Sequence, residues 1–503
     1  MAGDDSQSGA TRMAGHSSVD DTREANRPVT NRPVTNRPVT NRPLTTGMTR
    51  RRFVEFGASV LGSGVLGAGA VSVSLSPMLA WRVAAGELKG GAPTAAGTLP
   101  ANADGAARGK RPKSLIVFWT HGGLSQQDTY DMKPEAPAEY RGPYQAIATN
   151  VAGIQLSERF PRQARVMDKL SIIRSVHHEN GIHAPSAHWM QTGYFGPTLA
   201  RSAPQKPSFG SVISRVKGAH RPLMPAYVAL PKAEAFGYQG AVYLGATHNP
   251  FELNADPNTP RFEVPNLALP GGLSFDSVRD RAGLLREFDS LRRDIDPAGA
   301  IAGLDGFKAQ ALDMVTGPEV REAFDLTRES EALRDRYGRH MYGQAALLAR
   351  RLVEAGSACV TINTGYWDHH DNIEPNLERH LPPLDMALAA LVEDLVERGL
   401  WEDVVVYCAG EFGRTPLING HAGRDHWANC FSVLMGGGGL RGGQVIGASE
   451  PKGGAVVERL VTPQDLLATL YRVLDVPLQT HFEDSTGRPV SIVGAGQPIS
   501  ELF

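Results

Sequence analysis

The run Ser114-Leu115-Ile116-Val117-Phe118-Trp119-Thr120, followed by His121-Gly122-Gly123, decides the fold class of this chain. A short apolar run that ends in a polar, glycine-rich turn is typical of a strand buried on both faces of a sheet. Similar apolar runs recur at 358–363, 404–408 and 431–435. Buried strands of this kind need covering helices on both faces of their sheet.

Amphipathic helices are predicted between these strands. Leucines at positions 381, 384, 388, 391 and 395 recur at helical spacing, which predicts a helix over 380–398 that covers a sheet face. A similar, longer pattern predicts a helix over 330–354. Strands that alternate with covering helices indicate an α/β domain with a mostly parallel central sheet. Ligands of such sheets bind at the carboxyl ends of the strands.

Polar side chains follow each predicted strand. They lie in four groups, namely His121 with Ser125, Gln126, Asp128 and Asp131; 366–372; 410–416; and 423–427, shortly before the last run. Carboxylates and imidazoles are the ligands of Zn, Mn, Mg and Fe sites built from nitrogen and oxygen. A single His beside an Asp is commonly a surface pair, but four groups at predicted strand ends predict a divalent metal site.

The first 112 residues predict an export signal. Residues 1–48 carry the pentapeptide Asn-Arg-Pro-Val-Thr three times from Asn26, and we expect them to be disordered. Residues 49–85 place paired arginines and Phe53 before an uncharged, glycine-containing run, a pattern similar to a twin-arginine signal, and 86–112 read as a linker. The protein is therefore expected in the periplasm or outside the cell. An uncleaved segment anchored in the membrane is the alternative.

Charge balance and cysteine content narrow the possible partners and the type of fold. The chain has 51 Lys+Arg against 53 Asp+Glu, so nothing indicates a nucleic acid partner. Its three cysteines, Cys359, Cys408 and Cys430, are too few for a disulfide framework and predict small buried side chains.

Two sets of motifs resemble known families. Residues 183–193 (HAPSAHWMQTG) are similar to the nucleophile motif of sulfatases, C-x-P-S-R-x-x-x-x-T-G, but His183 replaces the cysteine and Ala187 the arginine. Without Cys or Ser at position 183, formylglycine chemistry is excluded. The blocks at 121–144, 367–372 (WDHHDN), 410–416 (GEFGRTP), 423–427 (GRDHW) and 436–449 resemble the bacterial domain-of-unknown-function family 1501, whose members are exported proteins of the alkaline phosphatase and sulfatase superfamily.

This resemblance implies a fold and a metal site. The fold is an alkaline-phosphatase-like α/β/α sandwich over 113–503, with a cap or insertion at about 200–330. The superfamily uses two divalent metal ions. The residues that correspond to its metal ligands or support them are Asp368, His370, Glu411, His426, His121 and Asp425. Phe412 stands where a ligand histidine is usual, so we expect one ion or an asymmetric pair: zinc, or magnesium, manganese or calcium.

Three further residues are candidates for catalysis. His183 lies at the nucleophile position, at the start of a helix predicted to run to Gln191, and it can bind metal, act as a base or attack the substrate. Ser186 lies one turn deeper and is either catalytic or a helix-packing residue. Arg414 either clamps an anionic substrate or pairs with Glu411 or a backbone carbonyl.

These residues predict an exported metal-dependent hydrolase that acts on a small phosphate or sulfate ester. A catalytically degenerate protein that uses the pocket for binding or assembly is the competing hypothesis, and an anion-transferring mutase is a third. Contact with a membrane is expected only through the signal segment.

Overall fold

The central feature of the fold is an eight-stranded sheet with helices on both faces. The computed structural model describes residues 111–196, 205–233, 238–260, 262–264 and 317–503. The strands lie in the order β12-β4-β11-β8-β1-β7-β5-β6. Their bounds are β1 Ser114–Trp119, β4 Leu170–Val176, β5 Tyr227–Leu230, β6 Phe251–Glu252, β7 Cys359–Asn363, β8 Val404–Ala409, β11 Phe431–Gly437 and β12 Gln444–Ile446.

The sheet is mostly parallel. Strand β1 pairs in parallel with β7 on one side and with β8 on the other. Strands β5 and β6 continue in the same direction, whereas β11 runs antiparallel to both β8 and β4. The prediction of an α/β sandwich with a mostly parallel sheet is therefore confirmed.

Alternate residues of β1 face two separate cores. Ile116 and Phe118 belong to the core that β1 shares with the long helices on one face. Leu115, Val117 and Trp119 belong to the core on the other face. All five side chains are fully buried, which is why this strand reads as a continuous apolar run.

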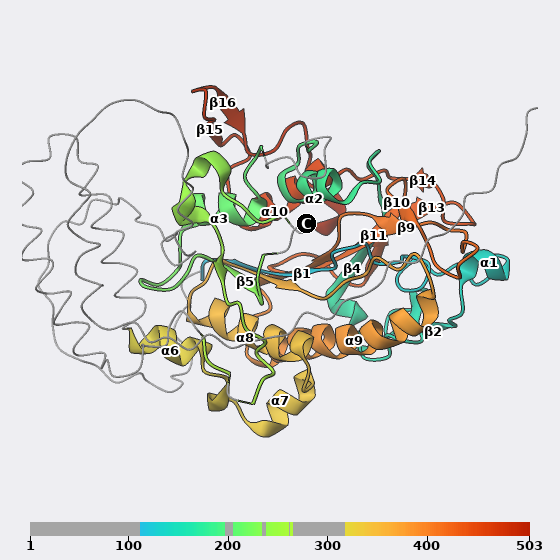
Figure 1. Cartoon of the computed structure of the whole chain (residues 1–503), viewed down its shortest axis with the longest axis horizontal. Helices are drawn as coiled ribbons and strands as arrows, with labels where there is room; N and C mark the ends of the chain where they lie inside the picture. The colour runs from blue at the N-terminus through green and yellow to red at the C-terminus, as the bar shows by residue number, and fades with distance from the viewer. Residues whose placement is uncertain (1–110, 197–204, 234–237, 261, 265–316) are drawn as a thin grey trace, which may run out of the picture. The chain divides into compact units, whose positions relative to one another are not determined.

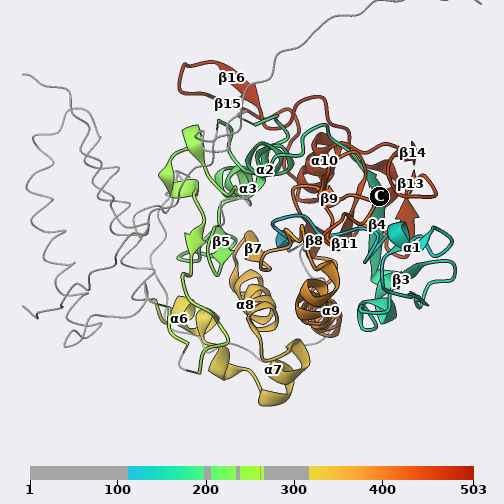
Figure 2. The same ribbon diagram turned by 45° about the vertical axis from the view of Figure 1, so that its right-hand side comes forward.

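Helices form a layer on each face of the sheet (Figure 1). Helices α6 Pro318–Phe324, α7 Glu331–Tyr337, α8 Met341–Ala355 and α9 Ile373–Glu397 lie below the sheet in this view. Helices α2 His183–Thr192, α3 Phe209–Lys217 and α10 Pro463–Val473 lie above it, and Figure 2 shows α8 and α9 side by side. The described part also contains the short helix α1 Ala138–Arg141, several 3-10 turns and four two-stranded ribbons. The ribbons are β2 Ala146–Ala148 with β3 Gln155–Ser157, β9 Gly413–Arg414 with β10 His426–Trp427, β13 Ala448–Ser449 with β14 Val456–Glu458, and β15 His481–Glu483 with β16 Pro489–Ser491.

The prediction of one helix over 330–354 is wrong, because the chain breaks between α7 and α8. Gly338 has a φ of 95°, in the left-handed region that interrupts a helix. His340 then caps α8, its Nδ1 accepting a hydrogen bond from the amide of Gly343 at 3.1 Å. The apolar pattern continues across the break because both helices pack on the same face of the sheet.

Other predicted elements are extended or joined by new ones. The helix expected over 380–398 begins earlier, at Ile373, and contains Pro382 and Pro383. The run at 431–435 is not the last core strand, because β12 follows it and pairs with β4. From the 200–330 region, β5 and β6 join the central sheet, while 265–316 lie outside the described residues. The N-terminal predictions, up to residue 110, also lie outside them.

The three cysteines are buried and unpaired, as expected. Within the described residues, no helix has the length and apolar character needed to cross a membrane.

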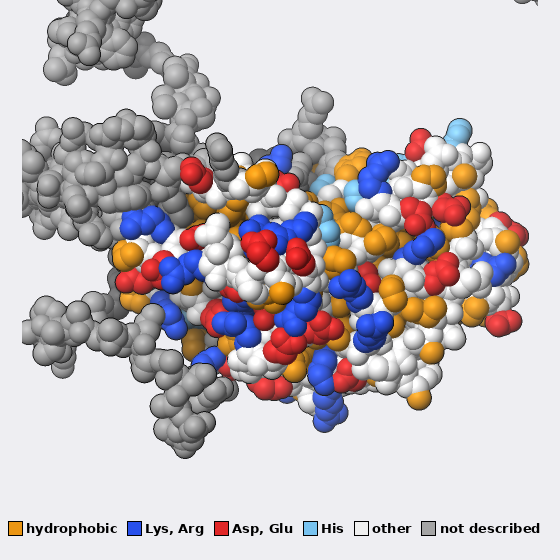
Figure 3. Space-filling view, turned by 90° about the horizontal axis from the view of Figure 1, so that it is seen from below, with side chains coloured by type: hydrophobic (Ala, Val, Ile, Leu, Met, Phe, Trp, Pro, Cys, Tyr) orange, Lys and Arg blue, Asp and Glu red, His pale blue; other side chains and the backbone are white. Residues whose placement is uncertain are grey.

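The face formed by α7, α8 and α9 carries charges of both signs. Figure 3, seen from below, shows Lys and Arg side chains intermingled with Asp and Glu. Ion pairs account for part of this pattern, with Arg336 2.7 Å from Glu397 and Arg398 2.6 Å from Glu354.

Candidate metal centre

The predicted site residues converge at the carboxyl ends of the parallel strands. His121 and Gly122 follow β1, Asp368 and His370 follow β7, and Glu411 follows β8. His183 is the first residue of α2, and His426 lies on the short strand β10. Loops from distant parts of the sequence therefore meet at one edge of the sheet, as parallel topology predicts.

Three imidazoles surround one carboxylate. The Nε2 atoms of His370 and His426 lie 2.9 Å and 3.0 Å from Oδ1 of Asp368. Nε2 of His183 lies 3.1 Å from Oδ2 of the same side chain. We call this group, Asp368 with His183, His370 and His426, the Asp368 cluster. Its imidazoles also approach one another, since the Nε2 atoms of His370 and His426 are 3.0 Å apart.

Each imidazole is oriented through its other nitrogen. Nδ1 of His183 lies 2.8 Å from Oε1 of Glu411, and Nδ1 of His370 lies 2.7 Å from Oδ1 of Asp425. Nδ1 of His426 lies 2.7 Å from the carbonyl oxygen of Gly181. An oxygen acceptor at Nδ1 fixes a hydrogen there and directs Nε2 toward Asp368, the usual orientation of metal-binding histidines.

Asp368 is held in its ionised form. Burial disfavours ionisation of Asp368, but hydrogen bonds from His183 and His426 and the positive charge of Arg414 more than offset it and hold the pKa well below its usual range. Burial likewise lowers the pKa of His183, yet the hydrogen bonds with Asp368 and Glu411 outweigh it and raise the pKa to about 9. The carboxylates that hold a proton on His183 would also attract a cation.

Glu411 is the most deeply buried carboxylate of the site. Its side chain has no exposed surface, and Oε1 accepts hydrogen bonds from the amide of Gly122 at 2.7 Å and from His183. Oε2 has no hydrogen-bond partner within the described residues. A buried carboxylate oxygen without a partner is costly, so this atom indicates a ligand or water that completes the site.

Glycine is required where the β1 loop passes the Asp368 loop. Gly122 has a φ of 100°, and a Cβ added there would lie 2.6 Å from the amide nitrogen of Asp368. This close approach lets the Gly122 amide reach Glu411. Because glycine has no Cβ and tolerates a positive φ, the loops that follow β1, β7 and β8 can meet here.

Phe412 fills the space beside two of the histidines. Its ring centre lies 5.0 Å from that of His183 and 4.5 Å from that of His426, and the side chain is almost fully buried. An aromatic ring offers no lone pair to a metal ion at this position. The expected loss of a ligand at residue 412 therefore corresponds to a filled apolar contact.

Arg414 is held inside the protein. Its guanidinium donates to the carbonyl oxygens of Gly123, Gly122 and Arg424, and Nη2 lies 2.5 Å from Oδ1 of Asp368. With only 1% of its side chain exposed, this arginine fits the pairing role considered from the sequence better than direct contact with a substrate.

Ser186 lies away from the cluster. Its hydroxyl donates to the carbonyl oxygen of Asn180 at 2.7 Å and is fully buried on the helix that His183 begins. These contacts tie α2 to the loop before it, which is the packing role. Its catalytic role stays a prediction that no contact of this structure supports.

His121 and Tyr366 form the rim of the site. The ring of His121 packs edge-on against that of Tyr366 at 5.8 Å, and burial followed by the charge of His183 lowers its pKa to about 4. Its Nδ1 has no hydrogen-bond partner in the described part of the chain. Tyr366, which sequence reasoning did not single out, donates to Oδ2 of Asp368 at 2.7 Å. Its position two residues before Asp368 was the available signal.

The donor set fits a divalent cation. His183, Asp368 and His426 each offer a ligand atom, and these atoms lie within 4.8 Å of one another. Imidazole nitrogens with a carboxylate oxygen suit zinc and related transition ions better than calcium, which prefers oxygen ligands alone. The side chain of His370 is 44% exposed, so one side of the cluster is open to solvent.

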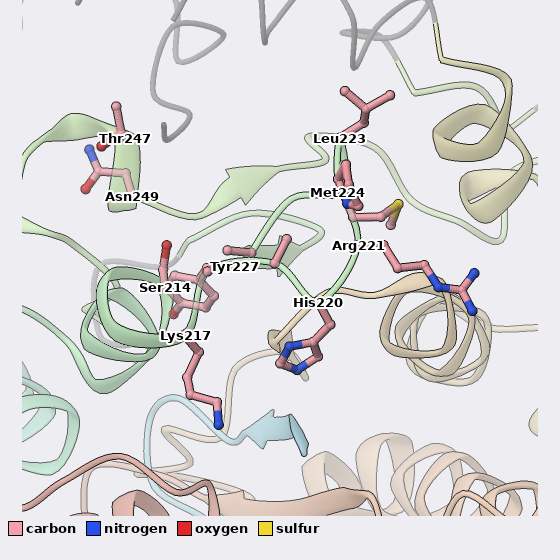
Figure 4. A pocket seen from close by; sticks show the side chains of 13 residues that line it. Ser214, Lys217, His220, Arg221, Leu223, Met224, Tyr227, Thr247 and Asn249 are labelled. Atoms are coloured by element: carbon pink, nitrogen blue, oxygen red, sulfur yellow. The ribbon is translucent and has the colours of Figure 1, made fainter. Parts of the chain in front are cut away.

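A separate cavity lies at the opposite ends of the strands. It has a volume of about 250 Å³ and is lined by the end of α3, the following loop and the start of β5. Figure 4 shows Lys217, His220 and Arg221 along this cavity. None of its lining residues belongs to the Asp368 cluster.

The sequence from residue 112 to residue 503 matches the model of a protein family of unknown function, DUF1501. The chain belongs to the DUF1501 family. The family predicted from the sequence is therefore confirmed. No curated protein matches this DUF1501 sequence.

Several solved structures resemble this DUF1501 protein at low identity. One is a protein in the alkaline phosphatase superfamily from Vibrio parahaemolyticus, with 10% identity, a TM-score of 0.37, and coverage of 78% of this chain and 71% of that one. The PsFucS1 sulfatase from Pseudoalteromonas sp. has 14% identity and a TM-score of 0.34, covering 73% and 68%. The lipoteichoic acid synthase LtaP from Listeria monocytogenes has 9% identity and a TM-score of 0.31, covering 76% and 74%. With similarity this low, the chemistry of the site rests on its own residues.

Proposed function

We propose that this protein is an exported, metal-dependent hydrolase that cleaves a phosphate or sulfate ester. The observation that carries the proposal is the convergence of three Nε2 atoms on the carboxylate of Asp368, each imidazole anchored through Nδ1. Imidazoles that are anchored through Nδ1 and directed through Nε2 at one carboxylate have the arrangement of metal ligands. A site that served packing alone would not need a charged carboxylate, which is costly to bury. Export is inferred from the twin-arginine pattern of residues 49–85.

The surroundings suit an anionic substrate. A divalent cation held here would neutralise charge on the ester oxygens and lower the pKa of water. Helix α2 begins at His183. Its N-cap residue, Ile182, makes no side-chain hydrogen bond to the amides of the first turn. Such amides favour an anion at the helix start. The exposed ring of Tyr366 stands at the same opening and can pack against the organic part of an ester.

The first test is metal content of the mature protein purified without chelator. We expect near-stoichiometric metal in the wild type and loss of it in the Asp368→Ala, His426→Ala double variant. Asp371→Ala is the matched control, because Asp371 is an exposed carboxylate in the same loop with no part in the cluster.

A panel of aryl phosphate and aryl sulfate esters then tests the reaction. Hydrolysis that disappears in the double variant and persists in Asp371→Ala supports the proposal. Bound metal without hydrolysis of any ester would contradict it and favour the binding or assembly role. Absence of metal after reconstitution would contradict the metal centre itself.

A further inference from the structure

Both ring nitrogens of His183 face carboxylates, which bears on whether this residue is a nucleophile. In sulfatase-like motifs, its position is that of the nucleophile. A nucleophilic imidazole must present a free lone pair to the substrate. Here, Nδ1 faces Oε1 of Glu411 at 2.8 Å and Nε2 faces Oδ2 of Asp368 at 3.1 Å. Both ring nitrogens therefore point at carboxylates of the protein.

His183 is oriented like the other two histidines of the Asp368 cluster. In all three, Nδ1 faces an oxygen outside the cluster and Nε2 lies 2.9 to 3.1 Å from a carboxylate oxygen of Asp368. The three side chains come from separate elements, namely the start of α2, the loop after β7 and β10. Their common geometry indicates a common task.

The described part of the chain supplies no substitute nucleophile at the cluster. The hydroxyl of Ser186 donates to the carbonyl oxygen of Asn180. All three cysteines are buried, two of them in strands β7 and β8 and the third directly before β11. The hydroxyl of Tyr366 is engaged as a hydrogen-bond donor to Oδ2 of Asp368 at 2.7 Å. Water is therefore the group left to attack an ester.

We propose that His183 is a ligand of a single divalent cation held by the Asp368 cluster, and that hydrolysis proceeds by direct attack of water. The oxygen of water bonds to phosphorus or sulfur as the bond to the ester oxygen breaks. Water loses one proton and the departing ester oxygen gains one, so the products are an alcohol and free phosphate or sulfate. The water step rests on the proposed function, whereas the role of His183 as a ligand does not.

Phe412 is the reason why we expect one cation rather than two at this site. Its ring packs against both His183 and His426, at the chain position where the superfamily resemblance implies a ligand histidine. Glu411 sits behind His183 and fixes its ring through Oε1, and thus acts as a positioning residue. A ligand of this kind loses affinity for metal when its anchor is removed, typically by 10- to 100-fold.

The test is a titration of the metal-free protein with Co²⁺, whose visible absorption reports its ligands. We expect one equivalent to bind to the wild type. His183→Gln should weaken binding at least tenfold and change the spectrum, and Glu411→Gln should weaken binding about 10- to 100-fold with all four ligands retained. His177→Gln is the matched control, since His177 bonds to the carbonyl oxygen of Asn429 outside the cluster.

Circular dichroism identifies any variant that fails to fold. If His183→Gln does not fold, the Co²⁺ affinity of Glu411→Gln tests the ligand role of His183. Unchanged Co²⁺ affinity and spectrum in both His183→Gln and Glu411→Gln would overturn the ligand role of His183 and leave the proposed function intact. Absence of Co²⁺ binding by the wild type would overturn both. Binding of two equivalents would overturn the single-cation proposal alone.

Discussion

At the scale of single residues, the site depends on carboxylates that each contact residues of several different loops. Asp368 receives contacts from three imidazoles, Tyr366 and Arg414, so one carboxylate links the β7 loop to every other part of the site. Glu411 ties His183 to the amide of Gly122. Since neither carboxylate can be replaced without leaving partners unpaired, substitutions at either should lower folding stability as well as metal affinity.

His188 provides a residue-scale prediction about acid stability. Its Nδ1 donates to the carbonyl oxygen of Tyr194, and its Nε2 accepts from the amides of Gln205 and Lys206, both at 3.2 Å. Burial lowers its pKa below the ordinary 6.5. The unfolded chain therefore binds a proton more readily, and stability falls as the pH decreases below 6.5.

We expect His188→Gln to weaken that pH dependence, by at most about 1.4 kcal/mol per pH unit for the one proton involved. Urea unfolding at pH 7.5 and pH 5.5 measures it. Parallel losses of stability in the wild type and the variant would show that His188 does not carry the effect.

At the scale of elements, the loop after β1 is the most constrained segment. Substitution of Gly122 by alanine adds the cost of a left-handed φ to a clash with the Asp368 backbone. We expect Gly122→Ala to lower the free energy of unfolding by about 2 kcal/mol or more and to weaken metal binding.

Gly153→Ala is its control, because Gly153 has a φ of 83° but no atom within 4 Å of an added Cβ. That variant should lose only about 1 kcal/mol and keep its metal. Equal losses in the two variants, measured by urea unfolding, would contradict a special packing role for Gly122.

The elements also show what the sequence could predict. Strand β1 and its neighbours were predictable because burial on both faces leaves a continuous apolar run. Helix α10 has recognisable start signals in its sequence, since Thr462 is the N-cap and Pro463 follows it, and a capping box joins Thr462 to Asp465. The two-residue strand β6 and the break at Gly338 were not predictable, because pairing and packing with distant segments determine them.

The same distinction applies to the site. Asp368, His370 and His426 were identified from motifs that carry them on predicted strand ends. Asp425, which was predicted as a ligand or its support, anchors Nδ1 of His370, whereas the anchor of His426 was not predictable, since the carbonyl oxygen of Gly181 carries no sequence signal. Two-sided binding of His183 by carboxylates likewise depends on three-dimensional approach of α2 to the loops after β7 and β8.

At the scale of the whole molecule, metal binding should be linked to stability. A cation that binds only the folded chain adds about 2.7 kcal/mol when its concentration is 100 times the Kd. For a domain of this size, this corresponds to a fall of roughly 3 °C in Tm when a chelator removes the metal. Differential scanning calorimetry with and without EDTA measures the shift. An unchanged Tm in protein shown to contain metal would contradict the linkage.

The central claim is that the Asp368 cluster, His183 included, holds one divalent cation. Anomalous diffraction at the zinc edge, from crystals grown with Zn²⁺, tests it most directly. We predict one peak at bonding distance, about 2.0–2.2 Å, from the three Nε2 atoms and a carboxylate oxygen of Asp368. A peak bonded to the other residues but not to His183 would contradict the ligand role of that residue, and no peak at the cluster would contradict the metal centre.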